Sequence, residues 1–140
     1  MTFTERYTWA GLAISIVTFA AYWTVVIVRA VTDGRPLVEV DWQGPMLWSL
    51  LLGGGLYAVV MLALWLRVRG EAHTDARDHE IERYAATTGG GITGLAGLAT
   101  LVLLALDAPA FWTATALFVG SFLGSLASIG VTLVAYRRGL

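Results

Sequence analysis

Four long apolar runs dominate this sequence, and none of them contains a charged side chain. They extend over about residues 9–28, 46–66, 85–106 and 111–136. An α-helix rises 1.5 Å per residue, so about 20 residues cross the roughly 30 Å hydrocarbon core of a bilayer. Because lipid offers no hydrogen-bond partners, each run must satisfy its backbone internally as a helix. The sequence therefore predicts an all-α, integral membrane four-helix bundle that forms a single transmembrane domain over residues 1–140.

Composition agrees with the bilayer as the solvent of this chain and excludes several kinds of partner and site. Charged residues make up 14% of the sequence, compared with about 25% in soluble domains. A formal net charge of −1 is not the concentrated basic face that nucleic acid requires, so we expect no nucleic-acid partner. The chain has no cysteine, which excludes disulfides, thiolate nucleophiles and Cys-ligated metals.

The arginines are distributed unevenly between the two ends of the expected helices. One end would carry only Arg29 and Arg35, in a loop and turn region with Gly and Pro that leaves room for a short extended stretch at 36–40. The other end would carry Arg6, Arg67, Arg69, Arg77, Arg83, Arg137 and Arg138. Positively charged loops stay in the cytoplasm. We therefore expect both termini and the middle loop to be cytoplasmic, with the protein in the plasma or inner membrane of the cell.

The middle loop and helical extension, residues 67–84, form the most polar part of the chain. Thr74 can cap a helix that starts at Asp75 and continues into the third run, where early carboxylates suit the helix dipole. This extension is either a solvated stalk or a contact surface for a partner. The candidate contact residues are Asp75, Arg77, Asp78, Glu80, Ile81, Glu82, Arg83 and Tyr84.

A metal site is a second interpretation of the same segment. His73, His79 and the carboxylates of Asp75, Asp78, Glu80 and Glu82 are all possible ligands. However, the segment lacks two histidines four residues apart and lacks the His-Glu-x-x-His pattern of helical zinc sites. We therefore expect no metal ion here.

Glycine and serine recur inside the second, third and fourth runs. Small residues four apart give one helix face a flat strip on which another backbone can approach closely. This pattern predicts either packing within one bundle, a dimer interface, or a pore lined by small groups. The helix-packing candidates are Gly53, Gly54, Gly55, Gly90, Gly94, Gly97, Gly120, Gly124 and Ser128.

The polar side chains inside the runs are all neutral. Hydroxyls in a helix can bond to the carbonyl one turn earlier, so they cost little to bury. Proton-driven transporters and ion pumps usually need an ionisable group at membrane depth, and this chain has none. No histidine or carboxylate lies beside a serine at that depth, and haem would lack an axial histidine. We expect no catalytic residue, no cofactor and no enzymatic activity.

The segment from Asp75 to Ile81 reads Asp-Ala-Arg-Asp-His-Glu-Ile. It resembles an Asp-Glu-Arg-Asp-x-x-Ile element found before the third span in small four-span prokaryotic membrane proteins of unknown function. Ala76 occupies the position of the glutamate in that element. The resemblance implies a cytosolic handle in an uncharacterised family, without an activity attached to it.

Two functional hypotheses follow from these patterns. The leading one is a non-catalytic accessory, regulatory or scaffold subunit, packed through its Gly and Ser faces on itself or on other membrane subunits, with the charged cytoplasmic helix as contact surface. The alternative is a small homodimeric channel or transporter for a neutral solute or an ion, because four spans are too few to enclose a wide path alone. An enzyme ranks behind both.

Overall fold

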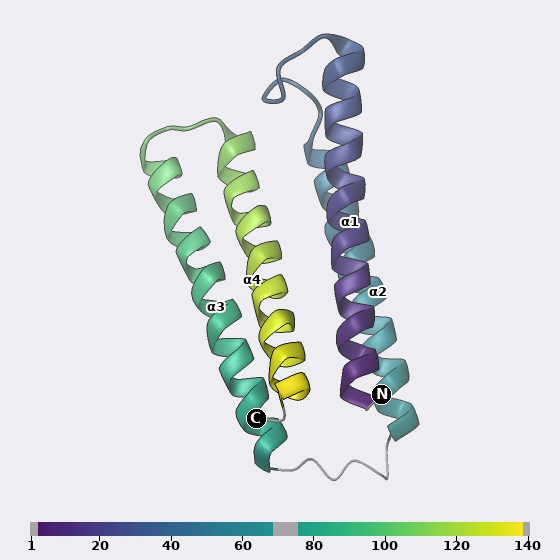
Figure 1. Cartoon of the computed structure of the whole chain (residues 1–140). Coiled ribbons are helices and arrows are strands. Elements are labelled where there is room, and N and C mark those ends of the chain that lie inside the picture. The colour runs from purple at the N-terminus through teal and green to yellow at the C-terminus, as the bar shows by residue number, and fades with distance from the viewer. Residues whose placement is uncertain (1–2, 69–75, 139–140) are drawn as a thin grey trace.

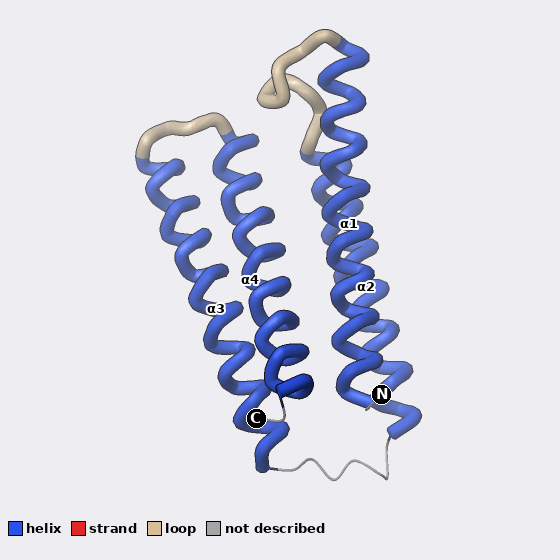
Figure 2. Tube along the Cα trace, in the orientation of Figure 1, coloured by secondary structure: helices blue, strands red, loops and turns tan. Residues whose placement is uncertain are grey.

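The computed structural model describes residues 3–68 and 76–138, which form four helices and the loops between them (Figures 1 and 2). The helices are α1 (Phe3–Asp33), α2 (Gln43–Val68), α3 (Ala76–Ala105) and α4 (Ala110–Arg138). They run up and down, so that α1 begins and α4 ends at one end of the molecule, the end at which α2 also ends and α3 begins (Figure 1). The prediction of an all-α fold is confirmed.

Three of the helices, α1, α3 and α4, are long and apolar enough to cross a membrane. The qualifying stretches are Thr8–Asp33, His79–Ala105 and Ala110–Arg137. Few of their side chains are buried: only 17%, 11% and 6% of the most apolar stretches of α1, α3 and α4 lie inside the molecule. The polar extension before the third apolar run is part of α3, so extension and run form one continuous helix.

Two helices are followed by a residue in the left-handed backbone conformation. α1 ends at Asp33, the next residue Gly34 has φ of 60°, and Arg35 N–H bonds the Ala30 carbonyl at 3.1 Å. After α3, Asp107 has φ of 52°, and Ala108 N–H bonds the Leu103 carbonyl at 2.9 Å. This pairing satisfies carbonyls that a helix end leaves free, and it reverses the chain within the short turn that the sequence predicts there.

The loop between α1 and α2 is shorter than the sequence predicts, and it contains a turn where the sequence allowed an extended stretch. α1 continues past Val28 to Asp33, because nothing before Gly34 breaks the helix. Residues 36–40 form a turn instead of an extended stretch, with Glu39 N–H bonded to the Pro36 carbonyl at 2.9 Å. Arg29 anchors this loop by donating to the Asp41 carbonyl at 2.9 Å and to its carboxylate at 3.2 Å.

The hairpin of α3 and α4 has the most extensive helix–helix contact in the described structure. A Cβ atom on Gly89 would lie 2.5 Å from the Gly124 carbonyl oxygen, and one on Gly120 would overlap the side chain of Ala96. Glycine is needed at these positions because two backbones approach there within the space of a side chain.

The hairpin of α1 and α2 packs less closely, and the two hairpins meet mainly through α1 and α4. Gly53 lies against Thr18, where a Cβ would be 3.2 Å from the threonine side chain. Within the described residues, α2 and α3 make no close backbone contact. The space between the hairpins is therefore bounded by α1 and α4 and left open between α2 and α3.

Candidate functional site

A groove of about 800 Å³ lies between the two hairpins, and all four helices line it. Its walls consist largely of glycine and of hydroxyl-bearing side chains. They include Gly11, Ser15 and Thr18 of α1, Ser49 and Gly53 of α2, Gly89 and Thr93 of α3, and Ser121, Gly124 and Ser128 of α4. A volume of this order falls within the range of roughly 300–1,000 Å³ typical of small-molecule sites.

Helical spacing explains why these small residues share one surface. Gly11, Ser15 and Thr18 recur at intervals of four and three along α1, and Ser121, Ser125 and Ser128 do so along α4. Residues three and four apart lie on one face of a helix. The lining of α1 extends from Thr8 to Phe19, so the groove runs for about 16 Å along the helix axis.

Five of the groove hydroxyls are bonded to their own helix. Thr18 donates to the Ile14 carbonyl at 2.8 Å, and Thr93 donates to the Gly89 carbonyl at 3.1 Å. Ser49, Ser125 and Thr132 make bonds of the same kind at 2.9–3.0 Å. These hydroxyls bond back to the preceding turn, as expected inside a helix, and their remaining oxygen lone pairs are free to face the groove.

Three other groove hydroxyls have no such bond. The hydroxyls of Ser15 on one wall and of Ser121 and Ser128 on the other make no hydrogen bond to any described residue. Each retains one donor and its acceptor lone pairs. A polar group left unpaired away from water costs about 1–3 kcal/mol. The groove thus presents unused hydrogen-bonding capacity on both of its walls.

Aromatic rings close the groove at one end. The rings of Phe19 and Phe122 stack at 3.9 Å with an interplanar angle of 6°, and Phe118 lies 5.6 Å from Phe19. Phe19 comes from α1, and the other two rings come from α4. These contacts join the two hairpins at the level where the lining ends.

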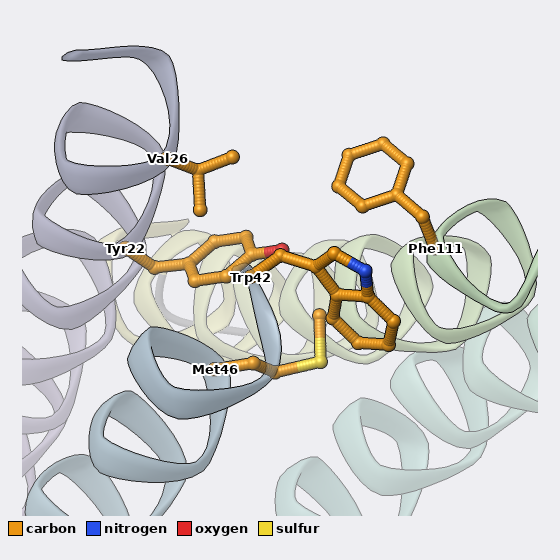
Figure 3. Close-up of a cluster of buried hydrophobic side chains, with 5 residues drawn as sticks. All are labelled: Tyr22, Val26, Trp42, Met46 and Phe111. Carbon is orange, nitrogen blue, oxygen red and sulfur yellow. The ribbon is translucent and has the colours of Figure 1, made fainter. Parts of the chain in front are cut away.

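Beyond these rings lies the buried core of the molecule (Figure 3). Tyr22 and Val26 of α1, Met46 of α2 and Phe111 of α4 surround Trp42, which precedes α2. The Trp42 side chain extends between Tyr22 and Phe111 in Figure 3, and its ring meets that of Phe111 edge to face at 5.8 Å. The core and the three phenylalanine rings therefore close the space between the hairpins on the side of the α1–α2 and α3–α4 loops, and together they are called the aromatic seal below.

Two hydroxyls are buried in this seal. Tyr22 is 1% exposed and Thr115 is 8% exposed, and their hydroxyls adjoin one another across the contact between α1 and α4. Neither oxygen has a hydrogen-bond partner of good geometry among the described residues. An apolar seal with imperfectly paired hydroxyls is less stable than one packed entirely from hydrocarbon.

Glu82 marks the opposite end of the groove. It is the one charged side chain among the described residues that line the groove. Its carboxylate is exposed and lies 4.0 Å from the Nδ1 atom of His79, one turn earlier on α3.

The predicted partner-contact residues are only partly placed. His73, Thr74 and Asp75 lie outside the described residues, and only the backbone of Arg77 and Asp78 is described, at the start of α3. Glu80, Glu82, Arg83 and Tyr84 are exposed, whereas Ile81 is buried. Ile81 therefore belongs to the packing of this chain, and the other four are the accessible ones. No group of three or more His, Asp or Glu in the described part of the chain could hold a metal ion.

The predicted packing glycines divide into two groups. Gly53, Gly120, Gly124 and Ser128 lie at contacts between helices. Around Gly54, Gly55, Gly90, Gly94 and Gly97 a side chain would meet nothing within 4 Å. Gly54 and Gly90 line the groove, so part of the small-residue pattern shapes a hollow instead of a contact.

Sequence reasoning missed the aromatic seal and the unpaired serines. The sequence assigned no role to Phe19 or Phe118, because no local pattern distinguishes a ring that meets another helix. The sequence does contain a partial signal. Aromatic residues cluster at 19, 22 and 23 in the first apolar run and at 111, 118 and 122 in the fourth.

The chain was also compared with known proteins. It matches no protein-family model, no curated protein and no solved structure. The resemblance of residues 75–81 to a cytosolic element of small four-span proteins thus stays a prediction, and the function must be argued from the groove.

Proposed function

We propose that this chain is a four-span integral membrane protein that binds a small solute between its hairpins and carries it across the bilayer. The observation that carries the proposal is the groove, which holds three unpaired hydroxyls on two facing walls and is closed at one end by stacked rings. No bond is made or broken in this role.

Insertion into a bilayer accounts for the apolar surface that the fold leaves uncovered. Large apolar side chains such as Val31 and Leu95 are 77% and 68% exposed, which is unfavourable in water over so wide an area. We assign α2 as the fourth span, because it has 26 residues and carries no charge between Gln43 and Leu66. Lipid then covers the outer faces of all four helices.

The orientation follows from the arginine distribution. Seven of the nine arginines belong to the end of the molecule at which α1 begins and α4 ends, which places this end in the cytoplasm of a plasma or inner membrane. In this orientation Glu82 stands at a cytoplasmic entrance and the aromatic seal lies toward the outside. The groove corresponds to an inward-open state.

Transport requires that the seal opens while the entrance closes. The cross-hairpin contact is small and lies between α1 and α4, so the hairpins can pivot against one another without unfolding either of them. The imperfectly paired hydroxyls of Tyr22 and Thr115 lower the cost of separating the helices at the seal. Such rigid-body motion of two packed units is the usual basis of alternating access.

A second copy of the chain completes the proposed transporter. The groove is open between α2 and α3, which do not touch within the described residues, and the exposed lining residues Gly54 of α2 and Gly90 of α3 mark this opening. A twofold dimer that pairs these faces would separate the solute from lipid, whereas a monomer would leave it exposed to acyl chains.

The test is solute flux in liposomes that contain the purified protein, with sugars, polyols, amino acids and primary amines as the panel. We expect one class to cross at least tenfold faster than in protein-free liposomes. Ser121→Ala should lower this flux several-fold because it removes an unpaired groove hydroxyl. Thr100→Ala is the matched control: Thr100 bonds the Ala96 carbonyl at 2.8 Å, lies outside the groove and should leave flux unchanged.

Absence of flux for every class of the panel would count against transport. Equal effects of Ser121→Ala and Thr100→Ala would indicate that flux follows stability and not the groove.

A second candidate function is an accessory or scaffold subunit that binds another membrane protein. The observation that favours it is the exposed start of α3, where Glu80, Arg83 and Tyr84 project a charged and aromatic surface. Native mass spectrometry of protein extracted gently from its own membrane separates the two proposals. A stoichiometric complex with other subunits, lost on combined replacement of Glu80 and Arg83 by Ala, supports the accessory role. A clean homodimer supports the transporter.

A further inference from the structure

We propose that the solute of this groove is an organic cation: a protonated amine joined to an apolar body. The inference rests on the proposed function and adds the sign of the charge and the hydrogen-bonding character of the solute. Three independent features of the groove lead to it, namely the charge at its entrance, the balance of donors and acceptors on its walls, and the rings at its closed end.

The described lining of the groove carries one negative charge, although arginines predominate at this end of the molecule. Glu82 is the one charged side chain among the described lining residues, and its carboxylate lies 4.0 Å from Nδ1 of His79, at the limit of an ion pair. Helix dipoles do not oppose this carboxylate, because two helices begin and two end at the same level and their partial charges offset one another. A carboxylate beside a low-dielectric groove raises the local concentration of cations and repels anions.

The walls accept more hydrogen bonds than they donate. Five hydroxyls, those of Thr18, Ser49, Thr93, Ser125 and Thr132, have donated their protons to carbonyls of their own helices. Their oxygens can still accept, as can those of Ser15, Ser121 and Ser128. No Arg, Lys or His occurs among the described lining residues.

This imbalance selects against anions. An ammonium group brings three donors and no acceptor, so it matches walls rich in oxygen lone pairs. A carboxylate brings only acceptors and finds three unpaired serine protons on the walls, besides the hydroxyls of Thr8 and Tyr57, which have interactions of their own. The penalty for leaving charged groups unpaired in a site of low dielectric makes the second arrangement the costlier one.

The closed end suits an apolar body. The rings of Phe19, Phe118 and Phe122 end the groove about 16 Å from the level of Thr8. A flat or aromatic group that reaches these rings can stack against them while its amine lies among the hydroxyls nearer Glu82. The groove thereby fits a molecule that has its charge and its hydrocarbon at opposite ends.

Three probes of nearly equal shape test the inference: 4-phenylbutylamine, 4-phenylbutan-1-ol and 4-phenylbutanoate. Binding to the full-length protein in detergent micelles is measured by titration calorimetry at pH 7. We expect the amine to bind at least tenfold more tightly than the alcohol, and the carboxylate not to bind measurably. Gly54→Phe is the blocked control. A Cβ atom at Gly54 would meet nothing within 4 Å, so the ring can fill the groove, and any binding that this variant retains is binding to the micelle.

Glu82→Gln should weaken amine binding about tenfold and leave alcohol binding unchanged. Glu80→Gln is the matched control, because Glu80 is exposed on the same helix but lines a different, apolar groove with Tyr84 and Val134. It should change neither affinity. Fluxes of the amine and the alcohol in liposomes are compared with the same variants.

Each outcome distinguishes the inference from the function on which it rests. If the alcohol or the carboxylate binds as tightly as the amine, and Gly54→Phe removes this binding, the groove binds solutes and the cation inference is overturned. If Glu82→Gln and Glu80→Gln have equal effects, the specific role of Glu82 is overturned. If no probe binds above the Gly54→Phe background and the wider panel shows no flux, the proposed function fails as well.

Discussion

Gly124 faces Gly89 so closely that a Cβ atom on Gly124 would lie 2.6 Å from the carbonyl oxygen of Gly89. Real Cβ atoms do not approach other atoms so closely, and the obstacle is backbone, which cannot rotate away. The approach fixes α4 against α3 and thereby holds Ser121, Ser125 and Ser128 toward α1 and the groove. The wall that carries most of the hydroxyls thus depends on two glycines in direct contact.

The first prediction concerns this contact. Gly124→Ala should lower the free energy of unfolding by about 1–3 kcal/mol, because overpacking forces the two helices apart. Gly94→Ala on α3 should change it by less than about 0.5 kcal/mol, since a side chain there meets nothing within 4 Å. Titration with a denaturing detergent, followed by the fluorescence of the 6 tryptophans, measures both. Equal losses would mean that the close approach of Gly124 to Gly89 does not determine the cost of the substitution, since helix propensity alone makes Gly→Ala favourable.

The second prediction concerns the hydroxyl of Tyr22. Tyr22→Phe should leave the free energy of unfolding unchanged or raise it by up to about 1 kcal/mol, because it removes a buried hydroxyl without a well-placed partner. Tyr22→Ala should lower it by about 3–5 kcal/mol through the cavity left in the core. A loss above about 1.5 kcal/mol for Tyr22→Phe would show that the hydroxyl has a partner in the folded protein.

The third prediction concerns the loop between α1 and α2. Arg29→Gln should increase amide hydrogen exchange several-fold at residues 36–41, because Arg29 holds both the carbonyl and the carboxylate of Asp41. Asp41→Asn should have the smaller effect, since the bond to the carbonyl persists. The expected change in global stability is below about 1 kcal/mol, because both side chains are largely exposed.

The control for this loop is Arg35→Gln, which removes a neighbouring positive charge with no ion pair in the described structure. It should leave exchange at 36–41 as it was. A matching increase for Arg35→Gln would attribute the effect to loop charge in general.

The fourth prediction concerns access to the groove. The chain has no cysteine, so single cysteines can be introduced without background. Ser128→Cys should react with a membrane-impermeant maleimide added from the cytoplasmic side. Thr115→Cys, which replaces a side chain 8% exposed in the seal, should react at least tenfold more slowly from either side. Rapid labelling of both from the outside would contradict the inward-open orientation.

The helices, the turn at Asp107 and the neutral character of the interior could all be predicted from sequence. Long apolar runs without charge form helices in a bilayer, because their backbone groups must bond internally. The Asp-Ala-Pro turn is so short that the third and fourth runs must lie antiparallel. The back-bonded hydroxyls also follow from local rules, because donor and acceptor are only one turn apart. Each of these features depends on residues close together in the chain.

The tertiary structure alone decided which small residues pack and which shape a hollow. Gly90 and Gly124 belong to similar small-residue patterns, yet Gly124 lies against a backbone while Gly90 borders an open groove. Likewise, Ser121 and Ser125 are four residues apart on one helix, and only Ser125 is bonded to its own backbone. Helical periodicity fixes the face on which a residue lies but not the helix, if any, that covers that face. Which helix covers which face depends on long-range contacts such as that of Phe19 with Phe122, which only the assembled hairpins bring together.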